Sequence, residues 1–292
     1  MDAVCISTLG LVLFIRGFVF VVLMGAVFVF DFVLRPSSAV VLSNFTGSIA
    51  MSIVLSVLSR VDEGLAKSLH DSRVPKPVSV TPLVYGNRVL WGGRFVVEAG
   101  GEVRFRVSAL EGIGLRLLDS LDGLGGVRLF NVDVSLMASS VEVVRVDELF
   151  SPGPTKFVIE FLSPIRFARR RTMRRRRVKY DFCPSMENIA RSTINYWVRV
   201  FGDGYFRDWP RFLRWVYNYV YTSDIYGRVV STRLPNSGEP QLGFIGRARY
   251  EIKSKRESRI AQLWALLRLA ELMNTGTTRS LGFGHIRVRG LG

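Results

Sequence analysis

The chain has 292 residues, of which 48% are apolar, so it is too hydrophobic to be disordered and long enough for about two domains. Forty Lys and Arg residues against 24 Asp and Glu residues give a formal net charge of +16. This excess predicts a polyanionic partner, either a nucleic acid or an anionic membrane surface, rather than an acidic small substrate.

The low content of cysteine and histidine restricts the chemistry. Cys5 and Cys183 cannot build a disulfide framework, and His70 and His285 lack the paired Cys or His motifs of an ordinary zinc site. We therefore expect a reduced, cytoplasmic protein without a metal or another cofactor. Only the two histidines can supply the side chain that most often moves protons near neutral pH.

The positive charge lies in the C-terminal half. Residues 1–150 contain 13 basic and 14 acidic residues, net −1, whereas residues 151–292 contain 27 basic and 10 acidic residues, net +17. The segment RFARRRTMRRRRVK, residues 166–179, has nine basic residues in fourteen positions, which suits phosphate neutralisation. The alternative is a solvated arm without a ligand. The RNA contacts predicted here are Arg169, Arg170, Arg171, Arg174, Arg175, Arg176 and Arg177.

An apolar segment near the N-terminus has two interpretations. Residues 17–30 are fourteen uncharged residues, which is short for a membrane span of about 20 residues, and AVFVFDFVL alternates like a strand. We expect a buried first strand that begins near Met24, with residues 1–23 as an extension outside the fold. A membrane anchor over residues 10–34 is the alternative.

The first half, residues 24–150, contains strand and helix patterns in the order β-α-β-β-α-β. Strands are predicted at 25–35, 78–85, 88–91, 95–99, 103–109 and 127–146, and helices at 46–59, up to His70, and at 112–121. This order is typical of a ferredoxin-like fold.

The second half, residues 155–292, repeats this order after the linker Ser151-Pro152-Gly153-Pro154. Strands are predicted at 156–167, 229–234, 242–251 and 285–288, and helices at 185–200, 210–221 and 256–273. Aromatic residues between 195 and 221 follow helical spacing and are assigned to the core rather than to base stacking. The predicted fold is thus α+β, with tandem ferredoxin-like (RRM-like) domains.

A glycine-rich loop, GTTRSLGFGHIRV, follows the last helix. Gly276, Gly282 and Gly284 permit positive φ and close backbone approach, while Arg279, Ser280 and two threonines offer donors for phosphate. The loop lacks the ending of a Walker motif and follows its helix, so it is no dinucleotide fingerprint. It predicts anion or RNA-backbone binding, with a plain helix-to-strand turn as the alternative. His285, next to Gly284, is a further candidate RNA contact or a simple strand residue.

The residues resemble the repeat-associated RNA-binding (RAMP) proteins and, within them, the CRISPR-associated endoribonuclease that cuts precursor CRISPR RNA inside its repeats. The similarity covers about residues 24–289 and lies in SLGFGHIRV after LLRLAELMNTGTTR, LGFIGRARYEI, FLSPIRF and LHDSRVPKPVSVTPL. It implies CRISPR repeat RNA, precursor and processed, as the partner, with effector-complex subunits and a homodimer as open possibilities.

The same resemblance implies His70 and Lys76 as catalytic residues, because some of these nucleases have a histidine and, six residues later, a lysine in the active site. Metal-independent cleavage uses the adjacent 2′-OH as nucleophile and leaves a 2′,3′-cyclic phosphate and a 5′-OH. His70 would transfer protons, and Lys76 would hold the phosphoryl oxygens. A surface or capping role is the alternative for His70.

The general base stays open, because similar nucleases carry a tyrosine on the first helix and GSIAMSIVLSVLSR has none. His70 alone, a tyrosine such as Tyr85, or alignment of the 2′-OH would replace it.

The sequence leaves three functions to compare. These are a metal-independent endoribonuclease, a non-catalytic RNA-binding RAMP subunit of a CRISPR effector complex, and a membrane-anchored basic protein.

Overall fold

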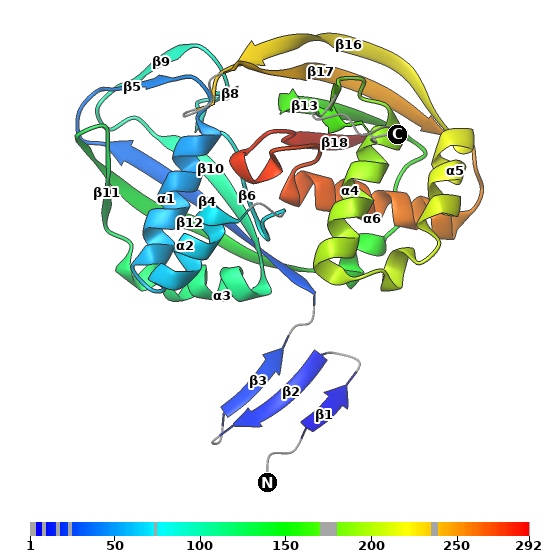
Figure 1. The fold of residues 1–292 in the computed structure, drawn as a ribbon, viewed down its shortest axis with the longest axis horizontal. Helices are drawn as coiled ribbons and strands as arrows, with labels where there is room; N and C mark the ends of the chain where they lie inside the picture. Colours follow the sequence, from blue (N-terminus) through cyan, green and yellow to red (C-terminus); the bar gives the residue numbers. More distant parts are fainter. Residues whose placement is uncertain are drawn as a thin grey trace.

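The computed structural model describes residues 4–7, 10–15, 18–22, 25–72, 75–169, 180–234 and 239–291. Within these ranges the chain forms two α+β halves that lie side by side (Figure 1). Both halves are built on antiparallel sheets.

The N-terminal half has the strand order of a ferredoxin-like fold. Its sheet runs β11-β12-β4-β10-β7-β8, and β6 pairs with β10. The principal strands β12, β4, β10 and β6 are thus the fourth, first, third and second in the chain, as a β-α-β-β-α-β unit requires. The elements are β4 (Ala26–Pro36), α1 (Gly47–Ser59), α2 (Glu63–Asp71), β6 (Val78–Val80), β7 (Val84–Tyr85), β8 (Arg88–Val89), β10 (Val103–Leu110), α3 (Glu111–Asp119), β11 (Gly126–Leu129) and β12 (Val132–Arg145).

The C-terminal half repeats this topology. Its four-stranded sheet runs β16-β17-β13-β18, which is the second, third, first and fourth strand of the unit. The elements are β13 (Lys156–Ile165), β14 (Phe167–Ala168), β15 (Tyr180–Asp181), α4 (Met186–Phe201), α5 (Trp209–Tyr219), β16 (Val220–Thr232), β17 (Gln241–Ile252), α6 (Glu257–Met273) and β18 (Ile286–Leu291). The predicted α+β class with two ferredoxin-like units is confirmed.

Strand β4 connects the two hydrophobic cores, because it is buried on both faces. Phe28, Phe30 and Phe32 pack with the helices of the N-terminal half, whereas Val27 and Val29 pack into the core of the C-terminal half. The alternation that predicted a strand therefore reflects two apolar environments and not one buried and one solvated face. This sharing holds the two halves together along one strand.

The segment before β4 forms strands β1 (Val4–Ser7), β2 (Gly10–Ile15) and β3 (Phe18–Val22), which pair only with one another within the described ranges. None of the described helices is long and apolar enough to span a membrane. Residues 26–34, which the membrane alternative assigned to a span, lie instead in the central strand β4.

Two parts of the secondary structure differ from the prediction. A short strand, β5 (Val40–Ser43), pairs with β9 (Arg94–Val97) although residues 40–43 were not predicted as a strand. Strand β16 begins at Val220, so the helix predicted over 210–221 ends earlier and the strand predicted at 229–234 is longer. Trp209, Tyr217, Tyr219 and Tyr221 are exposed, so the assignment of these four aromatic residues to the core was wrong.

Candidate active site

A cleft of about 470 Å³ lies between the two halves and collects groups from four separate segments. Its cationic side chains come from the turn after α2, from α4 and from the glycine-rich loop, namely Lys76, Arg191, Arg199 and Arg279. No Asp or Glu occurs among the described residues that line it. The cleft is therefore a strongly electropositive site suited to phosphate groups.

Lys76 is fixed in the cleft from two sides. The Tyr196 hydroxyl donates a hydrogen bond of 3.2 Å to the Lys76 carbonyl, which ties the turn to α4 of the other half. The Lys76 Nζ donates to the carbonyl oxygen of His70 at 3.1 Å. Burial lowers the pKa of Lys76, although the nearby Asp71 opposes this shift. The ammonium group is thus partly desolvated, so an anion in the cleft would compete with less water for it than at an exposed lysine.

His70 lies beside the cleft rather than in its wall. It is in the last turn of α2, and its Nδ1 is 3.1 Å from Asp71 Oδ1, whereas its Nε2 has no hydrogen-bond partner among the described residues. The imidazole is exposed, and the contact with Lys76 is made by the His70 backbone. The six-residue spacing therefore brings the Lys76 amino group to the His70 backbone carbonyl and not to the His70 imidazole. Of the two residues, Lys76 lines the cleft and His70 does not.

Arg279 has the most constrained side chain of the cleft. Its Nη2 donates to the Ser192 carbonyl, the Ser192 hydroxyl and the Gly276 carbonyl, each at 3.2 Å, and its guanidinium stacks 4.3 Å from the centroid of the Tyr196 ring. The Nη1 is buried, and none of the described residues accepts a hydrogen bond from it. Burial lowers the pKa of Arg279 to about 10, so the group stays charged at neutral pH. No carboxylate pairs with it in the described part of the chain, which leaves a fixed positive charge for a ligand.

The glycines of the loop have the positive φ that the sequence predicted. The φ values are 85° at Gly276, 90° at Gly282 and 67° at Gly284. Other parts of the protein backbone pack directly against two of these glycines. A Cβ at Gly276 would lie 2.6 Å from the Arg166 carbonyl oxygen, and a Cβ at Gly284 would lie 1.8 Å from the Thr275 carbonyl oxygen. Their small size is thus required for packing, and their contact with RNA stays a prediction.

The loop also joins the two halves. Asn274, in left-handed φ, donates from Nδ2 to Ser79 Oγ at 2.6 Å, to the Val80 carbonyl at 2.8 Å and to the Arg279 carbonyl at 2.9 Å. Phe283 is fully buried and packs against Phe45, with 4.4 Å between ring centroids. These contacts place Gly276, Arg279 and Ser280 in the wall of the cleft opposite Lys76.

A polar stripe on α4 was missed by the sequence analysis. Asn188, Arg191, Ser192, Asn195 and Arg199 line the cleft, and their spacing of three or four residues puts them on one face of the helix. Arg191 pairs with Glu187, whereas Arg199 has no partner among the described residues. The amphipathic pattern of α4 was a signal for this stripe in the sequence, because Ile189, Thr193 and Trp197 recur every four residues on the opposite, buried face of the helix.

His285 lies in a different place from the rest of the loop. It lines a second cavity of about 780 Å³ between the sheet of the N-terminal half and β18. Burial, with the charges of Arg106 and Arg287, lowers the pKa of His285 to about 4, and its buried Nδ1 has no hydrogen-bond partner within the described ranges. The prediction that groups His285 with Gly276 and Arg279 in one site is therefore not matched by the structure.

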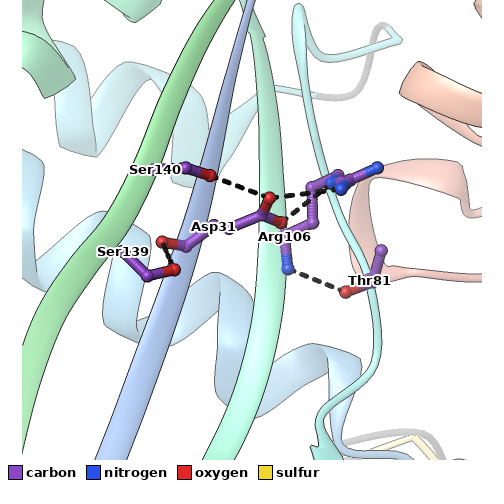
Figure 2. A network of polar contacts seen from close by, with 5 residues as sticks. All are labelled: Asp31, Thr81, Arg106, Ser139 and Ser140. Carbon is purple, nitrogen blue, oxygen red and sulfur yellow. Dashed lines mark hydrogen bonds and ion pairs between the residues drawn. The ribbon is translucent and has the colours of Figure 1, made fainter.

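The charges of the second cavity are largely neutralised within the protein. Figure 2 shows Asp31 between Ser140 and Arg106, with hydrogen bonds of 3.0 Å from Ser140 Oγ and 2.9 Å from Arg106 Nε. The Arg106 amide donates to Thr81 Oγ1 at 2.9 Å, and Ser139 Oγ donates to the Asp31 carbonyl at 3.0 Å. This cavity is less electropositive than the cleft.

The remaining candidates are separate from the cleft. Arg169 is exposed and its Nε lies 3.7 Å from Asp181 Oδ2. Tyr85 packs on the N-terminal core and does not line the cleft. The described residues contain no group of three His, Cys, Asp or Glu side chains that could hold a metal ion. Six of the predicted RNA contacts lie outside the described residues, namely Arg170, Arg171, Arg174, Arg175, Arg176 and Arg177.

The comparison with known proteins agrees with this fold. The family model of the CRISPR-associated endoribonuclease Cas6 matches residues 159–286, from β13 to the start of β18. A product complex of Thermus thermophilus Cas6 superposes with a TM-score of 0.69 at 20% identity, covering 89% of this chain and 100% of the other. The fold is that of Cas6.

A second similar structure carries the same fold at greater distance. A Cas6-related protein from Pyrococcus furiosus has a TM-score of 0.58 at 14% identity, with 91% of this chain and 99% of the other covered. No curated protein matches the sequence. The resemblance to CRISPR repeat-processing nucleases is confirmed, and the Cas6 match includes β13, α4, α6 and most of the glycine-rich loop.

Proposed function

We propose that this chain binds precursor CRISPR RNA and cleaves it within the repeats, without a metal ion, to give guide RNAs. The observation that carries the proposal is the composition of the cleft, where cations from both halves converge and the described lining residues include no carboxylate. An RNA backbone offers the matching negative charge, and a phosphorane in the cleavage reaction carries more of it.

The reaction needs only groups that RNA and the protein supply. The 2′-oxygen next to the scissile phosphate attacks phosphorus, the bond from phosphorus to the 5′-oxygen breaks, and the 2′-proton leaves while a proton is delivered to the departing oxygen. The products are a 2′,3′-cyclic phosphate and a 5′-OH. His70 is assigned to proton transfer, since its Nδ1 contacts Asp71 and its Nε2 is without a partner in the part of the chain that the structure describes.

Lys76 and Arg279 are assigned to charge stabilisation. Lys76 Nζ is partly buried, and among the described residues only the His70 carbonyl accepts a hydrogen bond from it. Arg279 Nη1 is a buried donor for which the described residues supply no acceptor. Each would bind a non-bridging phosphate oxygen more strongly as its charge grows in the transition state. Arg199, exposed at the same cleft, is assigned to the RNA backbone.

A non-catalytic RNA-binding subunit is the second candidate, and one observation favours it. The His70 imidazole is exposed to solvent and is not part of the cleft wall. In that case RNA binding would need the cleft cations, whereas His70 would be dispensable.

Cleavage of the repeat RNA from the same genome in excess EDTA separates the two. We expect one cut, product ends without a 3′-hydroxyl, and loss of cutting in His70→Ala with RNA affinity retained. Lys67→Ala, which removes an exposed lysine of the same helix outside the cleft, is the control. Tight binding without cutting by the wild type would refute the nuclease and favour the subunit.

A further inference from the structure

Arg166 carries a buried positive charge that packs against the glycine-rich loop. The residue is 7% exposed, and its guanidinium lies over the Tyr180 ring, 4.1 Å from the centroid, and 5.7 Å from the centroid of the Phe283 ring. No carboxylate forms an ion pair with it within the described ranges. Because a buried charge without a counterion costs stability, this arginine needs an explanation other than stability.

The side chain of Arg166 donates to the two threonines of the loop. Its Nε donates to Thr277 Oγ1 at 3.1 Å, and its Nη2 donates to Thr278 Oγ1 at the longer distance of 3.4 Å. The Arg166 carbonyl accepts from the Thr277 amide at 2.9 Å. Thr277 and Thr278 line the cleft, whereas Arg166 does not. The guanidinium thus acts on the cleft through these two hydroxyl groups.

Each threonine hydroxyl keeps a proton that it can donate into the cleft. A hydroxyl group has one proton and two lone pairs, and one lone pair of each threonine is occupied by an Arg166 N–H. Neither hydroxyl donates to any residue that the structure describes. A hydrogen bond received from a cation also polarises the O–H group and makes it a stronger donor. The pair of hydroxyls therefore matches an acceptor with negative charge.

Thr278 has a strained backbone at the same place. Its φ of 62° and ψ of 24° are left-handed, which is an outlier for a β-branched residue. Strain of this kind persists only where surrounding contacts hold it, and it is concentrated at ligand sites. Arg166 supplies such contacts, through the Thr278 hydroxyl and the Thr277 amide. A glycine would adopt this φ without strain, so a threonine here indicates that the hydroxyl is used.

We propose that Arg166 is a positioning residue for substrate binding, which directs the hydroxyl protons of Thr277 and Thr278 to a phosphate group of the RNA backbone. The inference rests on the proposed function, because it takes the ligand of the cleft to be RNA. Phosphate is the matching group, since the two hydroxyls and the guanidinium of Arg279, the next residue, offer adjacent donors at the cleft wall. Its negative charge also offsets the buried charge of Arg166.

The affinity of the full chain for the repeat RNA tests the role of the hydroxyl groups. We expect Thr277→Val and Thr278→Val, which keep the β-branched shape, each to weaken binding about tenfold, as for one lost hydrogen bond to a charged group. The slope of log affinity against log salt should not change, because no cation is removed. Thr222→Val, on the exposed strand β16 outside the cleft, is the control and should bind as the wild type does.

Arg166→Lys separates positioning from charge, since lysine keeps the positive charge but lacks the planar fork that reaches two acceptors. We expect about tenfold weaker binding with an unchanged salt slope. Added to the protein that carries both Thr277→Val and Thr278→Val, the same change should cause no further loss, because the hydroxyls through which Arg166 acts are absent. Urea denaturation shows whether each variant folds, and the threonine variants decide the question if Arg166→Lys does not.

The outcomes distinguish this inference from the proposed function. Wild-type affinity in both threonine variants, or a further tenfold loss when Arg166→Lys is added to them, would overturn the positioning role and leave the proposed function intact. Wild-type affinity in Arg166→Lys would show that its charge alone matters, which also overturns the role. A wild-type chain that does not bind the repeat RNA would overturn both.

Discussion

Burial of His285 predicts a loss of stability in mild acid. Burial is the main cause that lowers its pKa from 6.5 to about 4, and the charges of Arg106 and Arg287 act in the same direction. Between about pH 6.5 and pH 4, His285 is therefore protonated in the unfolded chain but neutral in the folded chain. The stability contributed by neutral His285 is fully present above about pH 6.5 and is lost as the pH falls towards 4.

The size of the effect follows from the two pKa values. A shift from 6.5 to about 4 corresponds to roughly 3 kcal/mol at full protonation, and about 2 kcal/mol of this is lost between pH 7 and pH 5. Glu271, on the same cavity, acts in the opposite direction, because burial raises the pKa of its carboxyl group and protonation then stabilises the fold. A single pH profile of the wild type would mix the two contributions.

His285→Gln, which is neutral at every pH, separates them. The free energy of unfolding is measured by urea denaturation of both proteins at several pH values between 7 and 5. We expect the difference between wild type and variant to change by about 2 kcal/mol in favour of the variant as the pH falls, since the Glu271 contribution is common to both. Parallel profiles would refute the buried, neutral state of His285.

Three further outcomes follow from the site. Lys76→Ala should slow single-turnover cleavage by about 10²-fold while RNA affinity changes little, because its amino group acts on the phosphorane; an equal loss in affinity would contradict this. Arg279→Gln should weaken binding and reduce the slope of log affinity against log salt by about 0.7–0.9, as expected when one phosphate contact is lost; an unchanged slope would exclude this contact. Gly284→Ala should lower the free energy of unfolding by about 3 kcal/mol, because its Cβ would lie 1.8 Å from the Thr275 carbonyl oxygen; Gly86→Ala, with positive φ and open space around it, should cost only about 1 kcal/mol in the same urea titration. Equal costs for the two glycine variants would show that φ alone matters.

The strands and helices of both halves were predictable because their apolar periodicity is local information. The Phe and Val alternation of β4 and the apolar spacing of α6 gave elements within a few residues of the observed bounds. Strand β16 was not predictable in the same way. Its residues 221–229 are exposed and follow an amphipathic helix without a break, so neither burial nor a turn signal marks where the helix ends.

The candidate site was only partly predictable, because its walls come from distant segments. The loop residues Gly276, Arg279 and Ser280 and the turn residue Lys76 were identified from motifs, and the structure brings them into one cleft. The α4 stripe carried no motif, and its role depends on which face of the helix meets the other half. His285 was grouped with its chain neighbours, but the loop residues that line the cleft end at Ser280, and His285, which directly precedes β18, lines the second cavity.

The glycine-rich loop connects folding and chemistry through the same few contacts. Asn274 binds Ser79 and Val80 of the N-terminal half, and five residues later Arg279 lines the cleft. On the other side, the Tyr196 hydroxyl holds the backbone of Lys76 while the Tyr196 ring stacks on the Arg279 guanidinium. The separation of the two cations is thus set by docking of the halves rather than by either half alone. A substrate phosphate between Lys76 and Arg279 would stabilise that docked arrangement, because it adds the negative charge that the cleft lining lacks.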